Sequence, residues 1–143
     1  MTKIEKLRQD NYGFGHGQEN PHGLRLLFTI TPPQATVAAQ IADKFQGWPG
    51  VAHGGIVATI LDEAMGHAVF GTTDSYCLLA ELEVFYLAPV MTSQALLITG
   101  RVEKTDARKI NAIAEIRRQD DHTLLAHSRG LYILVKGRED DLI

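Results

Sequence analysis

The residues best suited to chemistry fall in one stretch of the chain. It begins with His53, Gly54 and Gly55 and continues to about residue 70 with the spacing of a helix, interrupted by two adjacent carboxylates, Asp62 and Glu63. The first N–H groups of a helix have no partner within it and carry the positive end of its dipole. Glycine at this point lets a ligand approach the backbone closely. Such N–H groups would stabilise a carbonyl oxygen that gains negative charge during acyl transfer. The alternative is a Gly pair that only begins the helix.

The two carboxylates, Asp62 and Glu63, are candidates for the base or the nucleophile of such an acyl transfer. The other residues of this run, among them Val57, Leu61 and Met65, are apolar around most of the circumference, which is typical of a buried helix. A carboxylate in poor solvent has a raised pKa and can act as a base or a nucleophile towards an acyl group. A solvated stripe, or a structural carboxylate bonded to a strand, is the alternative that this pattern leaves open.

The spacing of these groups predicts a site shared between two subunits. Gly54 and Asp62 are eight residues apart in the sequence, which is about 12 Å along a helix. His53 and Asp62 would lie about 180° apart around the helix axis. One chain therefore cannot easily bring both ends to the same carbon atom, whereas two antiparallel helices across a dimer interface can do so twice.

The elements that must position this helix are predominantly strands. We expect six of them, two before the helix and four after it: Arg25–Thr31, Thr36–Ile41, Cys77–Leu87, Ala95–Glu103, Lys109–Arg118 and Leu124–Val135. Residues 2–10 predict a short solvated helix, and turn residues from Gly71 onward end the long helix. One helix on an antiparallel sheet is an α+β fold, and a single domain over residues 1–143 follows. A single helix leaves part of the sheet uncovered, so we expect a dimer.

Two of these strands show clear alternation. In the strand after the helix, Glu81 and Glu83 alternate with apolar residues, which predicts a half-buried strand. The residues of its predicted apolar face are Leu82, Val84 and Tyr86. The strand Lys109–Arg118 alternates in the same way, with this predicted inner face: Ile110, Ala112, Ala114 and Ile116.

The composition of the chain excludes several classes of protein. Hydrophobic residues make up 45% and charged residues 22%, and the formal net charge is -3 without a run of Lys or Arg. These values give no electrostatic reason to bind nucleic acid or an anionic membrane. No apolar stretch has the length of a membrane span, and the charged first residues lack the apolar core of a signal peptide. The one cysteine, Cys77, excludes an intrachain disulfide, so we expect a cytoplasmic protein.

Four segments of the chain resemble one known family. GVAHGGIVATILDEAMG is similar to the signature of hotdog-fold acyl-CoA thioesterases of the PaaI-like group, in which HGG at the helix entrance precedes an acidic residue nine positions after the His. Here that acidic residue is Asp62. Three further segments resemble family elements in the same order: GFGHGQENPHGLRLLF, ELEVFYLAPV and LLAHSRGLYILV. The resemblance covers nearly the whole chain.

This resemblance implies a fold, an assembly and an activity. The fold is an antiparallel sheet wrapped around one long central helix, in dimers or dimers of dimers with active sites at the dimer interface. The activity is hydrolysis of an acyl-CoA thioester, with coenzyme A as part of the substrate and no other cofactor or metal. Gly54 would be the main oxyanion donor, with Gly55 in support and His53 positioning the loop. Asp62 of the facing subunit would be the base or nucleophile, and Glu63 is the second candidate for the acid.

The chain also departs from the family pattern. Several members have an Asn where this chain has Gly47, and Gln46 would replace it only with a shift of one residue. Members often place a Ser or Thr near the start of the strand after the helix, where this chain has Leu79 and Ala80. A hotdog protein that binds an acyl thioester without hydrolysing it is therefore the second hypothesis. A hydratase is a weaker third, because the His and Asp spacing of those enzymes is missing.

Two sets of polar residues complete the sequence predictions. Arg108, Lys109 and Arg129 are candidates to contact the phosphates of coenzyme A, although charged residues on strands are often only solvated. His16 and His22 lie in a segment rich in Gly and Pro, and we expect them to be solvated. A metal site needs a matched set of three or four ligands, and nothing in the sequence supports such a site there.

Overall fold

A computed structural model of the chain describes residues 11–135. The expected short helix over residues 2–10 lies outside the described residues. The elements are the strands β1 to β6, a short 3-10 helix η1 and one long helix, with these bounds: β1 Thr29–Thr31, β2 Gln34–Ala39, η1 Asp43–Phe45, α2 Gly54–Thr73, β3 Cys77–Tyr86, β4 Leu96–Asp106, β5 Lys109–Arg118 and β6 Leu124–Leu134.

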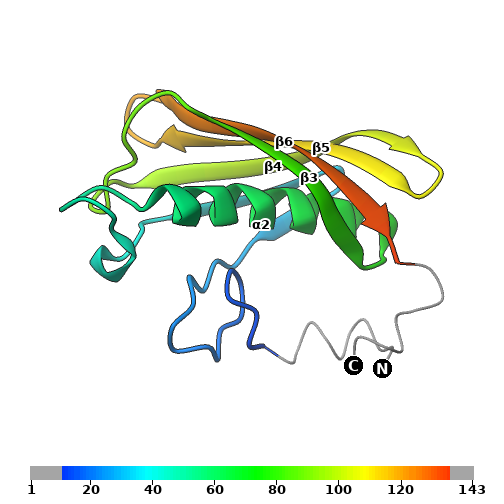
Figure 1. The fold of residues 1–143 in the computed structure, drawn as a ribbon, viewed down its shortest axis with the longest axis horizontal. Coiled ribbons are helices and arrows are strands. Elements are labelled where there is room, and N and C mark those ends of the chain that lie inside the picture. Colours follow the sequence, from blue (N-terminus) through cyan, green and yellow to red (C-terminus); the bar gives the residue numbers. More distant parts are fainter. Residues whose placement is uncertain (1–10, 136–143) are drawn as a thin grey trace.

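The six strands form one antiparallel sheet that curves over α2 (Figure 1). The order across the sheet is β1-β2-β4-β5-β6-β3, and every neighbouring pair is antiparallel. The strand that follows the helix, β3, lies at one edge of the sheet, beside β6. Residues 11–27 form a loop on the side of α2 away from the sheet (Figure 1). The predicted α+β arrangement of a sheet around one central helix is confirmed.

The side of α2 that faces the sheet is fully apolar. Its buried residues are Val57, Ile60, Leu61, Ala64, Met65, Ala68 and Val69. They pack against inward residues of the strands, including the predicted face of β5: Ile110, Ala112, Ala114 and Ile116. The prediction of a buried central helix is therefore confirmed. No helix within residues 11–135 combines the length and the apolar character that a membrane span requires.

The helix ends later than the sequence predicts. Gly71 was expected to begin the turn, but α2 continues to Thr73. The hydroxyl groups of Thr72 and Thr73 donate hydrogen bonds to carbonyls four residues earlier, each at 2.8 Å. Asp74 then adopts a left-handed conformation, with φ of 53°, and caps the end of the helix. The threonine hydroxyls are thus satisfied by carbonyls of the preceding turn, so these polar residues remain in the helix where the sequence predicts a turn.

The first predicted strand is mostly wrong. Only the last residues of the predicted Arg25–Thr31 strand pair in the sheet, as β1. Just before it, the N–H groups of Leu24 and Leu26 donate to the carbonyls of Phe14 and Gly15, at 2.8 and 2.9 Å. The backbone of this segment is therefore held by the loop of residues 11–27. That competition for backbone partners cannot be read from the local apolar pattern.

The predicted strand over Ala95–Glu103 continues further than expected. A bulge between Val102 and Lys104 absorbs one residue, and β4 then pairs with β5 as far as Asp106. The polar residues that predicted a turn lie on the exposed end of this hairpin, where a strand needs no apolar face. The strands β5 and β6 lie close to their predicted positions.

The prediction of a half-buried β3 is wrong for the single chain. Leu82 and Tyr86, which belong to the predicted inner face, are 38% and 53% exposed. The strand lies at the edge of the sheet, and only Cys77, Val84 and Phe85 of this strand are partly buried. An edge strand with apolar side chains and unpaired backbone groups is a surface on which another strand can pair.

Two glycine substitutions test the packing of α2 on the sheet. A side chain at Gly100 of β4 would overlap the backbone of Ala64, so Gly100→Ala should lower the free energy of unfolding by about 1–3 kcal/mol. Gly66 lies within α2 and an added methyl group meets nothing within 4 Å. Gly66→Ala should therefore raise the free energy of unfolding by about 0.5–1 kcal/mol. Urea denaturation measures both, and effects of the same sign would contradict this packing.

Candidate active site

At the entrance of α2, the N–H of Gly55 is engaged, whereas the N–H of Gly54 has no acceptor among the described residues. His53 is the N-cap, and its Nδ1 atom accepts the N–H of Gly55 at 2.9 Å. The Tyr86 hydroxyl, from the end of β3, donates to the carbonyl of Gly54 at 2.7 Å. Among the described residues, no group accepts a hydrogen bond from the N–H of Gly54. Of the two glycine donors that the sequence suggested, the Gly54 N–H is the one open to a ligand.

The position that carries an Asn in several members of the family that this sequence resembles has no amide side chain here. Gly47 occupies it, and an added Cβ would lie 3.3 Å from the Cα of His53. The side chain of the neighbouring Gln46 accepts the N–H of Gly50 at 2.9 Å. Gln46 therefore closes the turn before the helix and does not replace the missing Asn at its entrance.

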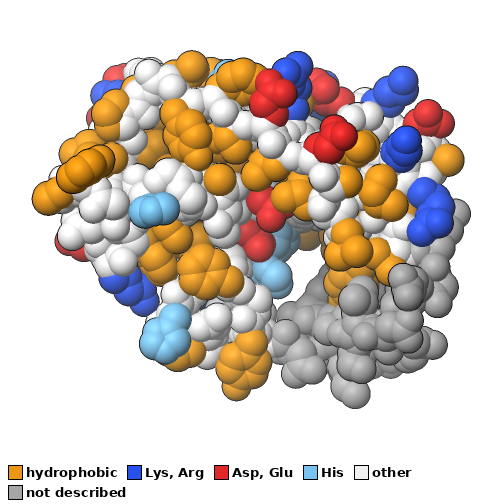
Figure 2. Space-filling model, viewed as in Figure 1, with side chains coloured by type: hydrophobic (Ala, Val, Ile, Leu, Met, Phe, Trp, Pro, Cys, Tyr) orange, Lys and Arg blue, Asp and Glu red, His pale blue; other side chains and the backbone are white. Residues whose placement is uncertain are grey.

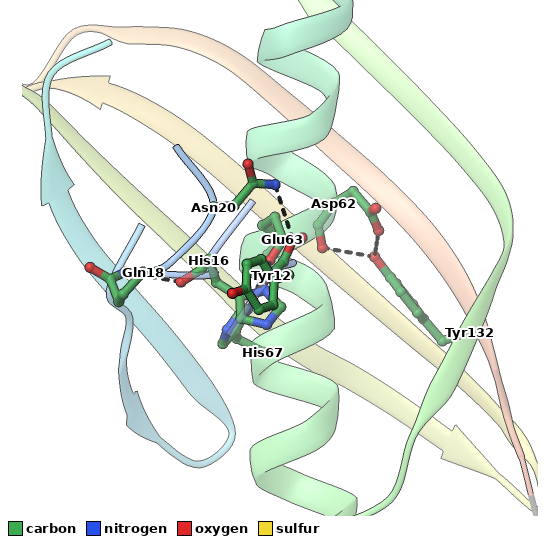
Figure 3. Close-up of polar contacts among 8 residues, drawn as sticks. All are labelled: Tyr12, His16, Gln18, Asn20, Asp62, Glu63, His67 and Tyr132. Carbon is green, nitrogen blue, oxygen red and sulfur yellow. Dashed lines mark hydrogen bonds and ion pairs between the residues drawn. The ribbon is translucent and has the colours of Figure 1, made fainter. Parts of the chain in front are cut away.

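Asp62 is hydrogen-bonded to the sheet. The Tyr132 hydroxyl, on the inner face of β6, donates to Oδ1 of Asp62 at 2.6 Å and lies 3.1 Å from its carbonyl oxygen (Figure 3). Burial raises the pKa of Asp62, the Tyr132 hydrogen bond lowers it, and the nearby charge of Glu63 raises it again, for a net upward shift. Burial and the Asp62 charge raise the pKa of Tyr132, so its hydroxyl stays protonated and donates.

Glu63 points in a different direction from Asp62, toward two histidines (Figure 3). Its Oε2 atom lies 3.0 Å from Nδ1 of His16 and 3.5 Å from Nδ1 of His67. The hydrogen bond to Glu63 raises the pKa of His16, although burial opposes the shift. The Nδ1 atom of His67 also lies 2.7 Å from the backbone carbonyl oxygen of Glu63. His16 was expected to be solvated; it is half-buried and bonded across to the helix instead.

A cavity of about 650 Å³ lies between the loop of residues 11–27, α2 and β3. Figure 2 shows this side as a hollow with carboxylates and histidines at its rim. Its polar lining residues are Asn11, His16, Asp62, Glu63, His67 and Tyr132. Its apolar lining comes from the loop, the helix and the edge strand: Leu26, Leu27, Phe28, Ile30, Phe70, Tyr76, Cys77, Leu78 and Leu79. Both carboxylates open onto this cavity, whereas the HGG residues do not line it.

The start of β3 has an irregular backbone at the place where members of the family that this sequence resembles often have a Ser or Thr. The register of β3 on β6 shifts between Leu79 and Glu81, so Ala80 lies in a bulge. Leu79 lines the cavity and places an apolar side chain there. Burial raises the pKa of the nearby Cys77 to about 11, so its thiol is not a nucleophile near neutral pH. Neither side chain of the bulge, Leu79 or Ala80, can orient a water molecule through a hydroxyl group.

The three predicted phosphate-binding residues do not form one cluster. Arg108 donates through Nε and a terminal nitrogen to the carbonyl of Leu134, at 3.2 and 2.9 Å. Arg129 bonds to Glu83 at 2.6 Å on the outer surface of the sheet. Lys109 begins β5, and Arg129 pairs with a residue four positions along that strand, a separation of about 13 Å.

Tyr132 is the site residue that sequence reasoning missed. It belongs to the buried face of β6, with Ala126, Ser128 and Leu134. A tyrosine on an inward strand face must find a partner for its hydroxyl group. Applied to the alternation of the last strand, that rule would have identified Tyr132 as the residue bonded to a polar group of the helix.

The sheet and helix match solved structures over most of their length. One thioesterase superfamily protein aligns with a TM-score of 0.76 and 26% identity, over 85% of this chain and 62% of that one. The E. coli PaaI protein aligns with a TM-score of 0.72 and 17% identity, over 80% of this chain and 82% of that one. These similarities define the hotdog fold.

The sequence comparisons identify the family. The family model of the thioesterase superfamily matches residues 49–125. This chain therefore belongs to that superfamily. Acyl-coenzyme A thioesterase THEM4 of Bos taurus is 32% identical over 135 residues, which are 93% of this chain and 55% of that protein. The Xenopus laevis protein of the same name is 32% identical over 127 residues, 89% of this chain and 53% of that one. The chain thus spans about half the length of the curated relatives it matches.

Removal of the Tyr132 hydroxyl tests the bond that holds Asp62. Tyr132→Phe should lower the free energy of unfolding by about 1–3 kcal/mol, because a half-buried carboxylate loses its partner. Tyr86→Phe removes a hydroxyl bond at an exposed position, where water replaces it, and should cost about 0.5 kcal/mol or less. Chemical denaturation of both variants measures the difference, and equal losses would contradict the role of burial.

Proposed function

We propose that this chain is an acyl-CoA thioesterase that hydrolyses its substrate at a site shared by two subunits. The observation that carries the proposal is the arrangement of α2. Its first N–H, at Gly54, is open to a ligand, and Asp62 on the same helix faces a cavity large enough for an acyl group. The named thioesterase relatives support this choice of reaction.

In this mechanism Asp62 activates water. The carboxylate takes a proton from a water molecule as that molecule attacks the thioester carbonyl; the C–S bond then breaks and the coenzyme A thiolate leaves with that proton. In the alternative, the carboxylate attacks the carbonyl itself and displaces the thiolate, and water then hydrolyses the resulting anhydride. Tyr132 holds Oδ1 in place, which leaves the second carboxylate oxygen to meet the substrate. The reaction needs no cofactor, since water and a coenzyme A thioester are its only reactants. Glu63 is the less suitable acid, because its carboxylate already contacts two histidines.

The Gly54 N–H would stabilise the oxyanion in the other half of the site. The N–H is at the positive end of the helix dipole, where a negatively charged oxygen is favoured. Gly55 supports it only indirectly, because its own N–H is held by His53. His53 therefore acts as a positioning residue for this loop and shapes the entrance of the helix.

The edge strand β3 is the surface on which we propose that the two subunits meet. It is ten residues long, it has a free edge, and its exposed apolar side chains include Leu78, Leu79 and Leu82. Pairing two such strands antiparallel would extend the sheet and cover these side chains. The two α2 helices would then run antiparallel, with each helix entrance directed toward the middle of the other.

The coenzyme A portion would lie outside the cavity. Arg108, Lys109 and Arg129 remain candidates to contact its phosphates. Arg108 and Arg129 already bond to other groups of the chain, whereas the Lys109 side chain has no hydrogen-bond or ion-pair partner among the described residues. We further expect action in the cytoplasm, as the single Cys77 suits a reducing compartment.

Hydrolysis assays across a panel of acyl-CoA thioesters test the role of Asp62. Asp62→Asn should lower kcat by at least about 100-fold, since the variant cannot accept a proton from water. Asp120→Asn, in the exposed turn between β5 and β6, is the matched control and should retain full activity. Retention of activity in Asp62→Asn would remove this residue from the mechanism.

The N–H of Gly54 can be removed without breaking the helix. Gly54 is the first residue of α2, where proline is well accepted, and His53 has φ of -58° and ψ of 136°, which suits a residue before proline. Gly54→Pro should therefore fold and lose about 100-fold or more in kcat. Gly54→Ala keeps the N–H, and its methyl group would lie 3.8 Å from the Tyr86 hydroxyl, so it should lose less.

Mixed dimers then test whether the site is shared. Asp62→Asn and Gly54→Pro are each inactive alone, but a dimer of one with the other contains one site with both intact groups. Unfolding and refolding an equal mixture should restore about a quarter of wild-type activity, as half of the dimers have one good site. No recovery would indicate that both groups serve the same chain. Gel filtration separates a dimer from a dimer of dimers.

The second candidate function is binding of an acyl thioester without hydrolysis. The apolar Leu79 in the cavity and the bulge at Ala80 favour it, because no hydroxyl there orients the attacking water. Calorimetry with acyl-CoA and a thiol-release assay on the same sample separate the two functions. Tight binding with no release of free thiol across the panel would establish the binding protein.

A further inference from the structure

We propose that His16, Glu63 and His67 form a binding site for a divalent transition-metal ion, with zinc as the best-suited ion. The three side chains come from the loop of residues 11–27 and from one face of α2. Each offers one donor atom, and these atoms lie within 4.8 Å of one another. The site is separate from the Asp62–Tyr132 pair and does not depend on thioester hydrolysis.

The chemistry of the donors fits zinc. Two imidazoles and a carboxylate are a set that zinc accepts, with bonds of about 2.0–2.1 Å. Donor atoms around a tetrahedral ion are then about 3.3 Å apart. The Nδ1 atom of His16 already lies 3.0 Å from Oε2 of Glu63. One donor atom from each of the three side chains lies within 4.8 Å of the others, so rotation of the side chains can bring all three to one ion.

The orientation of His67 favours coordination through its outer nitrogen. Its Nδ1 atom lies 2.7 Å from the carbonyl oxygen of Glu63, one helical turn earlier. A hydrogen bond to this carbonyl keeps the proton on Nδ1, so Nε2 retains its lone pair. The ring of Phe28 stacks on His67 with centroids 4.6 Å apart and limits its rotation. A backbone carbonyl behind a histidine is a common arrangement at metal sites.

The loop is shaped to bring His16 to the helix. A side chain at the neighbouring Gly15 would overlap the carboxylate of Glu63, so only glycine allows this approach. The three side chains are 41%, 19% and 20% exposed for His16, Glu63 and His67, respectively. They are therefore shielded from most of the solvent without being sealed from an entering ion.

Charge and space at the cluster also favour a cation. Asp62 adjoins Glu63, so two partly buried carboxylates lie within one turn of α2. A bound cation would compensate this concentration of negative charge. All three ligands line the cavity of about 650 Å³, which leaves room for a water molecule as the fourth ligand. Zinc with three protein ligands commonly keeps such an open position.

Titration of the full chain with zinc tests the site. The protein is first treated with a chelator, dialysed into a buffer that does not bind metals, and titrated by calorimetry. We expect one zinc ion per chain and a higher midpoint of thermal unfolding in the presence of zinc. His16→Gln and His67→Gln should each weaken zinc binding by at least about tenfold. Circular dichroism of each variant verifies its fold.

Two control variants separate this cluster from other donors. His22→Gln removes a histidine of the same loop that is exposed, and Cys77→Ser removes the thiol that lines the same cavity. Both should bind zinc like the wild type. Wild-type affinity in both His16→Gln and His67→Gln, or loss of binding in either control, would overturn the proposal, and so would absence of zinc binding by the wild type.

A spectroscopic measurement on the wild type covers the case in which a variant fails to fold. Cobalt replaces zinc in tetrahedral sites and gives visible absorption bands whose form depends on the ligands. Nitrogen and oxygen ligands give these bands without the thiolate charge-transfer band in the ultraviolet. That spectrum at one cobalt ion per chain is the expected result. A thiolate band, or the spectrum of cobalt in water, would contradict the assignment.

Discussion

The structure depends on the burial of α2 along its length, with a polar stripe on the face that the sheet does not fully cover. Burial fixes the helix against the strands through close approach at Gly100, but it also takes Asp62 and Glu63 out of bulk water. Partly buried carboxylates need partners. The sheet supplies Tyr132 for the first, and the loop supplies His16 for the second. The sheet and the loop are thus both joined to the helix through its acidic residues.

Adjacent positions on one helix have therefore become chemically different. Asp62 has one neutral donor and a raised pKa, whereas Glu63 lies between two imidazoles that can carry positive charge. About 100° of helix rotation separates them. Asp62, proposed to accept a proton, and Glu63, proposed to bind a cation, can therefore line one cavity without competing for the same partners.

The parts that the sequence predicted are those governed by local pattern. The apolar surface of α2 and the alternation in β5 follow from burial of one face, and both were confirmed. The parts that it could not predict depend on partners distant in the chain. Tyr132 meets Asp62 across seventy residues, and the loop takes the backbone donors that would have lengthened β1. For β3, exposure depends on its edge position, which the pattern of a single strand does not contain.

The hydrogen bond between Tyr86 and Gly54 has a consequence for strand pairing. A bulge near Leu79 means that the register of β3 on β6 is not fixed by regular pairing alone. Side chains alternate along a strand, so a slip of one residue would turn Tyr86 to the opposite face, away from α2. The hydroxyl reaches the helix only in the observed alignment. The bond is exposed and contributes little stability, so its consequence is geometric: it joins the last residue of β3 to the first residue of α2 and relates the end of the edge strand to the entrance of the helix.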